Sequence, residues 1–380
     1  MAAELALTSG FFVPAKDVRT RARIGCVHRM SRFRISLAGT VFAVVALLFP
    51  AAAPIAQADS GEESHPRYSD VTSVGVHNTF EKHRYAFLAD ALDAGTGMIE
   101  LDVWTNAVGP DWRVSHSNPV GNDNNCAGAT SAAQMRTGPR DQFLGGCLAD
   151  LRAWHDANPA HPPVMVKVEM KDGFTAPLGR GPREFDALVR SHLGDAVFGP
   201  ADLADRAGST TLDDAVRTGG WPDRSELSGK FLFELIPGTV QEVNPLDHWW
   251  TDRAYATHLR DLARVGGLGL ATAFPAVHKA QPGDPREARY DADLRPWFVV
   301  FDGDASAFAA DGIDMRWYRD NGYLVVMTDA HNVAPALDPV APAEDAARGR
   351  VTELAARSAS VVSTDWTPLP QVLSMVVDRS

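Results

Sequence analysis

From Val71 onward, short runs rich in apolar and β-branched residues alternate with longer stretches in which apolar residues recur every three or four positions. The first pattern is typical of buried strands and the second of amphipathic helices. We expect strands at residues 71–77, 98–104, 112–117, 164–170, 230–236, 297–303, 323–329 and 360–366. Eight strands that alternate with helices predict an α/β fold, a single TIM β/α barrel.

The connection between the second and third predicted strands does not fit an ideal barrel. It is the short stretch TNAVGPD, which begins at Thr105. Parallel neighbours need a crossover of a dozen or more residues, usually a helix. We therefore expect an irregular barrel at this point, or a β-hairpin.

The predicted strand at 164–170 carries charges on one of its faces. The sequence reads VMVKVEMKDGF from Val164. Because successive side chains of a strand alternate between faces, Lys167, Glu169 and Lys171 share one face and apolar residues share the other. A ladder of ion pairs on the surface would explain this pattern, and so would one wall of a charged site.

The N-terminal segment differs from the rest of the chain. The basic stretch MSRFR, from Met30, precedes an apolar run, and Ala56-Gln57-Ala58 supplies small residues for cleavage. This pattern is typical of a secretory signal peptide. We expect residues 1–58 to be removed and residues 59–380 to form one barrel domain of a secreted protein. A membrane anchor is the alternative, but two prolines interrupt the apolar run.

The net charge restricts the partners. The formal charge is −12, and loss of residues 1–58 removes seven basic and two acidic residues, which makes it −17. Such a surface repels nucleic acids and anionic membranes at long range. We expect no nucleic-acid partner, and an anionic substrate must be held by local cations or by a metal. A monomer is the default expectation.

Two cysteines remain when the segment that contains Cys26 is removed. Cys126 and Cys147 form an even pair in an exported chain, which predicts a disulfide. Their spacing matches no metal-binding or redox motif. The chain-entropy model gives such a bond about 3 kcal/mol of stability.

Polar residues gather at the ends of the predicted strands, where the active sites of β/α barrels lie. In chain order they are His77, Asn78, Glu100, Asp102, His116, Lys167, Glu169 and Lys171. Carboxylate and amide oxygens suit Ca²⁺ rather than zinc. Two histidines beside such a cation suit general acid catalysis and charge stabilisation in phosphoryl transfer. Each residue alone has a structural explanation, but together they predict one site.

Four segments carry a resemblance to a known family: GVHNTFEK, ELDVW, WRVSHSNP and KVEMKDGF. They resemble the calcium-dependent phosphatidylinositol-specific phospholipases C of streptomycetes, within the TIM-barrel phospholipase C-like phosphodiesterases. The resemblance extends from about Ser69 to the C-terminus. It implies cleavage of phosphatidylinositol to diacylglycerol and inositol 1,2-cyclic phosphate, with inositol 1-phosphate as a slower product.

The resemblance also implies the roles of individual residues. The calcium ligands would be Asn78, Glu100, Asp102 and Glu169. Glu100 is our first choice for the base that takes the proton of the inositol 2-hydroxyl. His116 would protonate the diacylglycerol oxygen, and His77 would hold a phosphate oxygen.

Four further residues are candidates for contacts with phosphate or inositol: Lys167, Lys171, Asp329 and Asp365. For the two lysines, an ion pair with Glu169 is the alternative. For the two aspartates, which end later predicted strands, a turn or a cap is the alternative.

The stretch NPLDHWW places Trp249 and Trp250 in a loop after the fifth predicted strand. Adjacent tryptophans suit insertion at a membrane interface, where phosphatidylinositol would be reached. Packing beneath the loop as part of the core is the alternative.

Two other functions stay open. A glycerophosphodiester phosphodiesterase shares this type of barrel and an acidic metal site, but that group typically has His-Arg where this chain has His77 and Asn78. A non-enzymatic barrel that binds inositol lipids is the second alternative. Against it stands the fact that no expected catalytic or metal position is missing.

Overall fold

Eight parallel strands form the centre of the computed structural model, which describes residues 65–106, 108–244 and 250–380. The barrel strands are β1 (Val71–Val76), β2 (Met98–Trp104), β4 (Val164–Met170), β5 (Phe231–Pro237), β6 (Ala273–His278), β7 (Val300–Asp304), β8 (Leu324–Thr328) and β9 (Val361–Thr364). They pair in this order, and the pairing of β1 with both β9 and β2 closes the barrel. The predicted TIM β/α barrel is confirmed.

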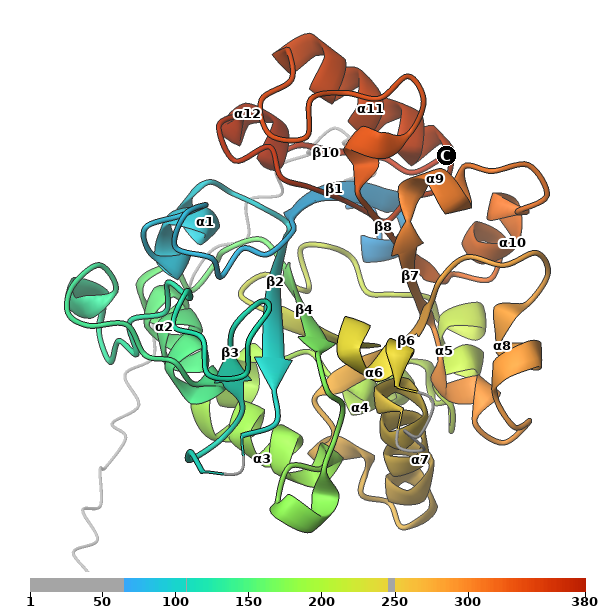
Figure 1. Ribbon diagram of the computed structural model, residues 1–380. Coiled ribbons are helices and arrows are strands. Elements are labelled where there is room, and N and C mark those ends of the chain that lie inside the picture. The colour runs from blue at the N-terminus through green and yellow to red at the C-terminus, as the bar shows by residue number, and fades with distance from the viewer. Residues whose placement is uncertain (1–64, 107, 245–249) are drawn as a thin grey trace, which may run out of the picture. The chain divides into compact units, whose positions relative to one another are not determined.

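Helices surround the strands on the outside (Figure 1). The α-helices are α1 (Leu88–Asp93), α2 (Leu144–Ala157), α3 (Pro182–Leu193), α4 (Pro200–Ala207), α5 (Leu212–Thr218), α6 (Thr239–Val243), α7 (Thr251–Arg264), α8 (Pro285–Arg289), α9 (Ala305–Phe308), α10 (Met315–Asp320), α11 (Glu344–Ala356) and α12 (Pro370–Leu373). The short 3₁₀ helices are η1 (Tyr68–Asp70), η2 (Ala132–Gln134), η3 (Ala176–Leu178), η4 (Gly194–Ala196), η5 (Leu268–Leu270), η6 (Arg295–Trp297) and η7 (Ala330–Asn332). No helix of the described residues is long and apolar enough to cross a membrane.

Two strands differ from the sequence prediction. Within the predicted strand at 112–117, only β3 (Arg113–Val114) forms, and it pairs antiparallel with the end of β2. The expected alternative, a hairpin, is therefore the correct one, because the connection is too short for a crossover. In place of the predicted strand at 112–117, the fifth strand of the barrel is β6, which was not predicted from the sequence. Its Pro275 cannot donate a ladder hydrogen bond, so the run AFPAVH does not look like a central strand.

The barrel closes where β1 meets β2, and a glycine permits the contact. Gly75 pairs with Met98, and a Cβ atom at Gly75 would lie 2.7 Å from the Cβ of Met98. The first half of β1 pairs instead with β10 (Val376–Asp378), which runs antiparallel to it. The C-terminal strand thus covers the part of β1 that β2 does not reach.

The charged face of β4 points into the barrel. Lys167 and Lys171 are 2% and 4% exposed, and the apolar residues between them are also buried. The alternative interpretation of this pattern, a ladder of ion pairs on the surface, is therefore wrong, because both faces of this strand are covered. The charges instead form part of a polar layer inside the barrel.

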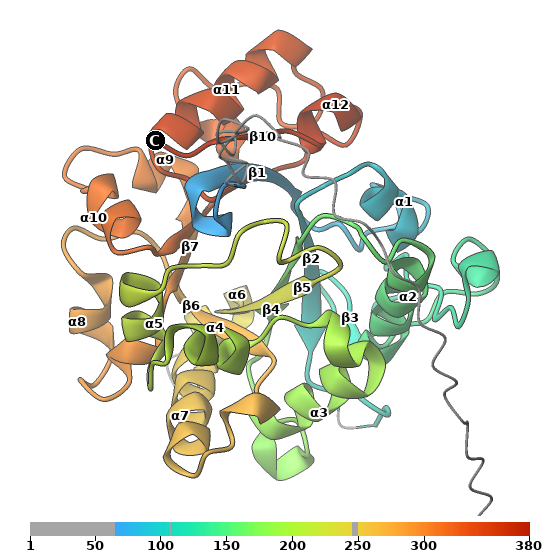
Figure 2. The same ribbon diagram turned by 180° about the vertical axis from the view of Figure 1, so that it is seen from behind.

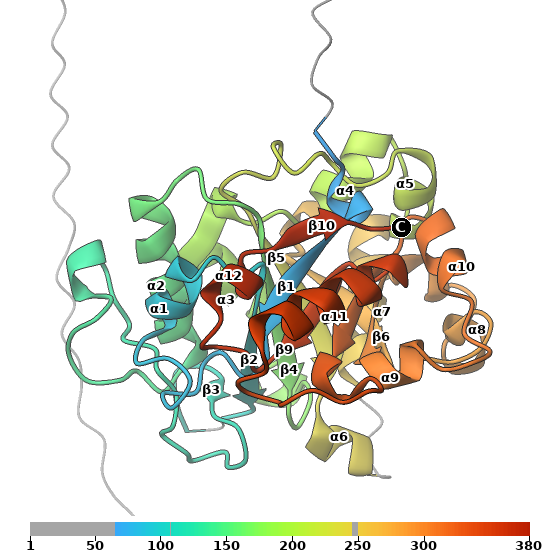
Figure 3. The same cartoon turned by 90° about the horizontal axis from the view of Figure 1, so that it is seen from above.

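The two ends of the barrel carry different elements. The β2–β3 hairpin and α6 lie at the end where the parallel strands finish (Figure 3). Helices α4 and α5, inserted between β4 and β5, lie at the opposite end (Figure 2). Functional side chains at the carboxyl ends of the strands therefore share one end of the molecule.

A disulfide joins the loop after β3 to α2, as the sequence predicted. It links Cys126 to Cys147, whose Cα atoms are 4.9 Å apart. The signal peptide predicted in residues 1–58 and the side chain of Trp249 lie outside the described residues.

Candidate active site

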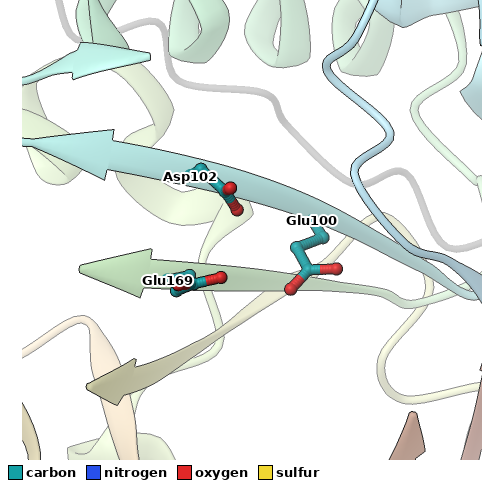
Figure 4. A group of neighbouring side chains, drawn as sticks. All are labelled: Glu100, Asp102 and Glu169. Atoms are coloured by element: carbon teal, nitrogen blue, oxygen red, sulfur yellow. The ribbon is translucent and has the colours of Figure 1, made fainter. Parts of the chain in front are cut away.

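Three carboxylates on two neighbouring strands point toward one another at this end of the barrel (Figure 4). Glu100 and Asp102 come from β2 and Glu169 from β4, and one oxygen of each lies within 4.8 Å of the others. The parallel register produces this cluster, because Asp102 is the direct partner of Glu169. The structure thus brings together three of the four residues predicted as calcium ligands.

Two oxygens of the predicted ligands are buried without a hydrogen-bond donor among the described residues. They are Oδ1 of Asp102, within this cluster, and Oδ1 of Asn78, the fourth predicted ligand, whose backbone N–H binds Glu100. Burial, reinforced by the charge of Glu169, raises the pKa of Asp102 well above its usual value. A divalent cation would satisfy both oxygens and offset the repulsion, and an all-oxygen set fits Ca²⁺.

Lys171 offsets part of the negative charge between the two strands. Its Nζ lies 3.2 Å from Oδ2 of Asp102 and 2.8 Å from Oε1 of Glu169. Burial alone would raise the pKa of Glu169, but the positive charge of Lys171 outweighs it and lowers that pKa. The ion-pairing alternative for Lys171 is thus present in the structure, and a substrate contact stays a prediction.

Lys167 holds a second set of carboxylates deeper in the barrel. Its Nζ lies 2.8 Å from Oδ2 of Asp302 and 3.5 Å from Oε1 of Glu100. Burial would lower the pKa of Lys167, but Asp302 and Glu100 raise it above its usual value. Glu234 is the direct partner of Lys167 in the sheet register. Burial together with the charge of Asp302 raises the pKa of Glu234 strongly. Lys167 therefore fixes the orientation of Glu100 from the interior of the barrel.

The turn after β1 presents His77 and Asn78 to the site. Asn78 has a φ of +49°, a left-handed conformation that asparagine tolerates better than most residues, and its backbone N–H donates to Oε2 of Glu100. The hydroxyl of Thr79 donates to the carbonyl of Val76 and accepts from the backbone N–H of Glu100. The turn and β2 are thus fixed to each other.

His77 lies between two carboxylates. Its Nδ1 is 3.2 Å from Oδ1 of Asp365, and its Nε2 is 4.0 Å from Oε2 of Glu100. Burial alone would lower the pKa of His77, but the charges of Glu100 and Asp365 outweigh burial and raise it to about 9. His77 is therefore held as a cation at neutral pH.

His116 stands in the loop after β3 with a side chain that is 45% exposed. The preceding residue, Ser115, fixes this loop, because its N–H donates to the carbonyl of Asp102 and its carbonyl accepts from the indole of Trp104. Nδ1 of His116 lies 3.2 Å from Oε1 of Glu81. Both predicted catalytic histidines thus have a carboxylate beside Nδ1.

A cavity of about 120 Å³ opens at the site. Of the residues predicted from the sequence, His77, Glu100, Lys167, Glu169 and Asp329 line it. Seven other residues also line it and were not predicted, and five of them are polar: Thr239, Glu242, His278, Asp302 and Thr328. Asp302 lies near the end of the predicted strand 297–303, so the rule that polar residues near the ends of barrel strands form the site could have found it. His278 belongs to β6, which was not predicted.

A second cavity, of about 630 Å³, adjoins the first and shares Glu242 and His278 with it. Trp250 is among its lining residues and is half-buried. The other predicted site residues line neither cavity: Asn78, Asp102, His116, Lys171 and Asp365. Asp365 contacts His77, and its binding of inositol stays a prediction.

A β/α barrel in which a cluster of carboxylates lies beside a histidine has the chemistry that a metal-dependent phosphodiesterase requires. The family model "Phosphoinositide phospholipase C, Ca2+-dependent" matches residues 78–255. The Ca²⁺-dependent phosphatidylinositol-specific phospholipase C of Streptomyces antibioticus is 59% identical with a TM-score of 0.80, over 82% of this chain and 99% of that chain. The chain therefore belongs to the Ca²⁺-dependent phosphatidylinositol-specific phospholipase C family.

More distant structures show the same fold. A calcium-dependent phosphoinositol-specific phospholipase C from Pseudomonas sp. is 21% identical with a TM-score of 0.60, over 80% of this chain and 92% of that chain. A comparison with curated proteins gives no match.

Proposed function

We propose that this chain cleaves phosphatidylinositol to diacylglycerol and inositol 1,2-cyclic phosphate, and that it releases inositol 1-phosphate more slowly. The observation that carries the proposal is the cluster of Glu100, Asp102 and Glu169, together with the buried, unpartnered amide oxygen of Asn78, whose backbone N–H binds Glu100. These four residues would hold Ca²⁺. When bound, Ca²⁺ would lower the pKa of the inositol 2-hydroxyl and offset charge on a phosphate oxygen.

Glu100 is our candidate for the base. Lys167 and the backbone N–H of Asn78 contact its two oxygens at 3.5 and 3.2 Å and hold the carboxylate in one orientation, which supports this role. Glu100 would take the proton of the 2-hydroxyl as that oxygen forms a bond to phosphorus.

The two histidines would divide the remaining work. His77, kept positively charged by its neighbours, would donate a hydrogen bond to a phosphate oxygen whose charge grows in the transition state. The bond between phosphorus and the diacylglycerol oxygen would break, and His116 would give that oxygen a proton. Water would then attack the cyclic phosphate, with the acid and base roles reversed.

Membrane contact is a further part of the proposal. Large apolar side chains are exposed in the loops and short helices that follow β2, β3, β4, β5 and β8, at the same end of the barrel as the site: Val108, Val120, Leu178, Val240, Val243 and Val340. Single exposed apolar residues are normal, but their position around one mouth supports shallow insertion into a bilayer. Such insertion would bring the headgroup of phosphatidylinositol to the cavity.

We further propose that the protein works outside the cell as a monomer. The signal-peptide pattern in residues 1–58 supports export, and the disulfide between Cys126 and Cys147 is typical of an oxidising compartment.

The choice of substrate separates this function from its alternatives. Purified protein would be incubated with Ca²⁺ and either phosphatidylinositol vesicles or glycerophosphoinositol, and ³¹P NMR would follow the products. We expect the lipid to be preferred and the cyclic phosphate to appear first. Preference for the deacylated substrate would favour the glycerophosphodiesterase, and binding without turnover would favour a lipid-binding barrel.

A further inference from the structure

The turn after β1 contains an arginine that contacts the partners of both histidines. Arg84 follows Glu81 by three residues, and the turn is tight because the N–H of Arg84 donates to the carbonyl of Glu81 at 2.9 Å. Its side chain is only 13% exposed. A guanidinium in such a covered place needs several acceptors, because burying an unpaired charge is costly.

Those acceptors are two carboxylates that lie far from each other in the sequence, Glu81 and Asp365. Nε of Arg84 lies 3.2 Å from Oε2 of Glu81. Nη1 and Nη2 lie 2.8 and 3.0 Å from Oδ1 and Oδ2 of Asp365, a two-pronged contact. Glu81 is the carboxylate beside His116, and Asp365 is the carboxylate beside His77. One guanidinium therefore connects both pairs of histidine and carboxylate.

We propose that Arg84 is a positioning residue that holds the two histidines in one fixed arrangement. An ionised carboxylate only accepts hydrogen bonds, so each imidazole that faces one must carry its proton on Nδ1. Arg84 prevents both carboxylates from rotating, and thereby directs Nε2 of His77 and of His116 away from the carboxylates and toward the substrate. Arg84 itself contacts neither substrate nor metal.

The planar shape of the side chain is what this role requires. The guanidinium presents donors in a rigid fork and can bind Glu81 and Asp365 at the same time. An ammonium group is a single point charge on a flexible chain, so lysine would keep the charge but lose the fixed geometry.

A purely structural salt bridge is the competing explanation, because Arg84 also ties the turn after β1 to the end of β9. The chain offers a matched control in Arg260 on α7. It binds two carboxylates, those of Asp261 and Asp293, at 2.9 and 2.7 Å, and its side chain is 21% exposed. Arg260 lies outside the site, so it reports the cost of losing a similar ion pair.

Kinetics on phosphatidylinositol vesicles would compare Arg84→Met, Arg84→Lys and Arg260→Met. Misplacing a catalytic group by about 1 Å can cost about 100-fold, so we expect a loss of about this size in kcat for Arg84→Met and a smaller loss for Arg84→Lys. KM and the calcium affinity should change little, and Arg260→Met should resemble the wild type. A kcat for Arg84→Met equal to that of Arg260→Met would overturn the proposal. So would a rise in KM, or a loss of calcium affinity, as large as the loss in kcat. If Arg84→Met does not fold, Arg84→Lys against Arg260→Lys decides in the same way.

This inference rests on the proposed function, so a second measurement needs no substrate. Long-range ¹H–¹⁵N spectra of the imidazole rings show which ring nitrogen carries the proton. We expect Nδ1–H at His116 in the wild type, and a mixture of tautomers at His116 in Arg84→Met; the cationic ring of His77 carries a proton on both nitrogens and does not report a tautomer. An unchanged spectrum of His116 would reject the role of Arg84, whereas an inactive wild type with the expected spectrum would reject only the function.

Discussion

Asp102 on β2 and Glu169 on β4 are direct partners in the parallel register, and their carboxylates project side by side into the barrel. Two buried negative charges at this distance repel each other, and Lys171 offsets only part of the repulsion. A fold that keeps both carboxylates together is less stable without a cation than it would be with neutral side chains. Metal binding and stability are therefore linked at this pair.

The first prediction concerns Asp102→Asn. Because burial and the charge of Glu169 raise the pKa of Asp102, ionisation of this carboxyl destabilises the calcium-free fold. The calcium-free variant should gain on the order of 1 kcal/mol in the free energy of unfolding, as is common when functional charges are removed. It should also lose the stabilisation that Ca²⁺ gives the wild type. Thermal unfolding with and without Ca²⁺ measures both.

Asp252→Asn is the matched control for that experiment. Asp252 is also buried with a raised pKa, caused first by burial, but it accepts a hydrogen bond from Tyr290 outside the carboxylate cluster. This variant should keep the full effect of Ca²⁺. If Asp102→Asn kept it too, the assignment of Asp102 as a ligand would be wrong.

The second prediction concerns the histidines. His77→Ala and His116→Ala should each lower kcat by about 100- to 10,000-fold, the usual range for a group that transfers or stabilises charge in the transition state. Circular dichroism and calcium binding should be unchanged. His83→Ala is the control, since the side chain of His83 is 69% exposed and its Nε2 lies 3.4 Å from Glu81, the carboxylate that also contacts His116. Near-normal turnover in either active-site variant would remove that histidine from the mechanism.

The third prediction concerns membrane contact, and two equally exposed valines make the comparison. Val243 on α6 lies at the active-site end, and Val265 follows α7 at the opposite end; both are 78% exposed. Val243→Asp should lower activity on phosphatidylinositol vesicles and spare activity on a soluble short-chain analogue, because the charge opposes insertion. Val265→Asp should change neither. Equal effects on vesicle activity would argue against a docking face.

The fourth prediction is a pH dependence far from the site. Nδ1 of His155 lies 3.1 Å from Nε2 of His161, and Nδ1 of His161 donates to the carbonyl of Pro162. Nε2 of His161 therefore accepts from His155, and the ring of His161 is held neutral. Burial lowers the pKa of both histidines in the fold. The unfolded chain therefore takes up protons first as the pH falls through about 6.5, and stability decreases by up to about 1.4 kcal/mol per pH unit for the buried His161. The more exposed His155 contributes less because solvent screens its charge.

Urea unfolding at several pH values between 7.5 and about 5 tests this slope. The His161→Phe variant should show a shallower decrease than the wild type, whereas exposed His83→Ala should leave the slope unchanged. An identical slope in His161→Phe would show that other groups control acid stability.

The fifth prediction concerns the disulfide between Cys126 and Cys147. The replacement of both cysteines by serine should lower the free energy of unfolding by about 3 kcal/mol, as expected for a closed loop of this length. Reduction should have a similar effect on the wild type and none on the variant. A variant as stable as the oxidised wild type would contradict this estimate.

Much of the fold was readable in the sequence because buried strands and amphipathic helices have distinct periods. The errors occurred where that signal is weak. Pro275 hides β6, and the apolar alternation around Arg113 suggested a barrel strand where only a short hairpin forms. The length of the connecting loop, rather than the strand pattern, indicated the hairpin.

The site was predicted as a set of residues, but their partners were not. A strand pattern shows that Lys167 and Glu169 face opposite ways from their apolar neighbours, yet only the register of β4 against β2 tells which acid each charge meets. Arg84 could not have been found in this way. Its partner Asp365 lies 281 residues away along the chain, and only closure of the barrel brings the two together.

The most direct test of the account is a calcium titration of phosphatidylinositol cleavage, followed by addition of EGTA. The four-oxygen site of Asn78, Glu100, Asp102 and Glu169 predicts a saturable increase in activity with Ca²⁺, loss of that activity with EGTA, and its return when Ca²⁺ is restored. Undiminished cleavage in excess EGTA would contradict the central claim that these residues act through a bound cation.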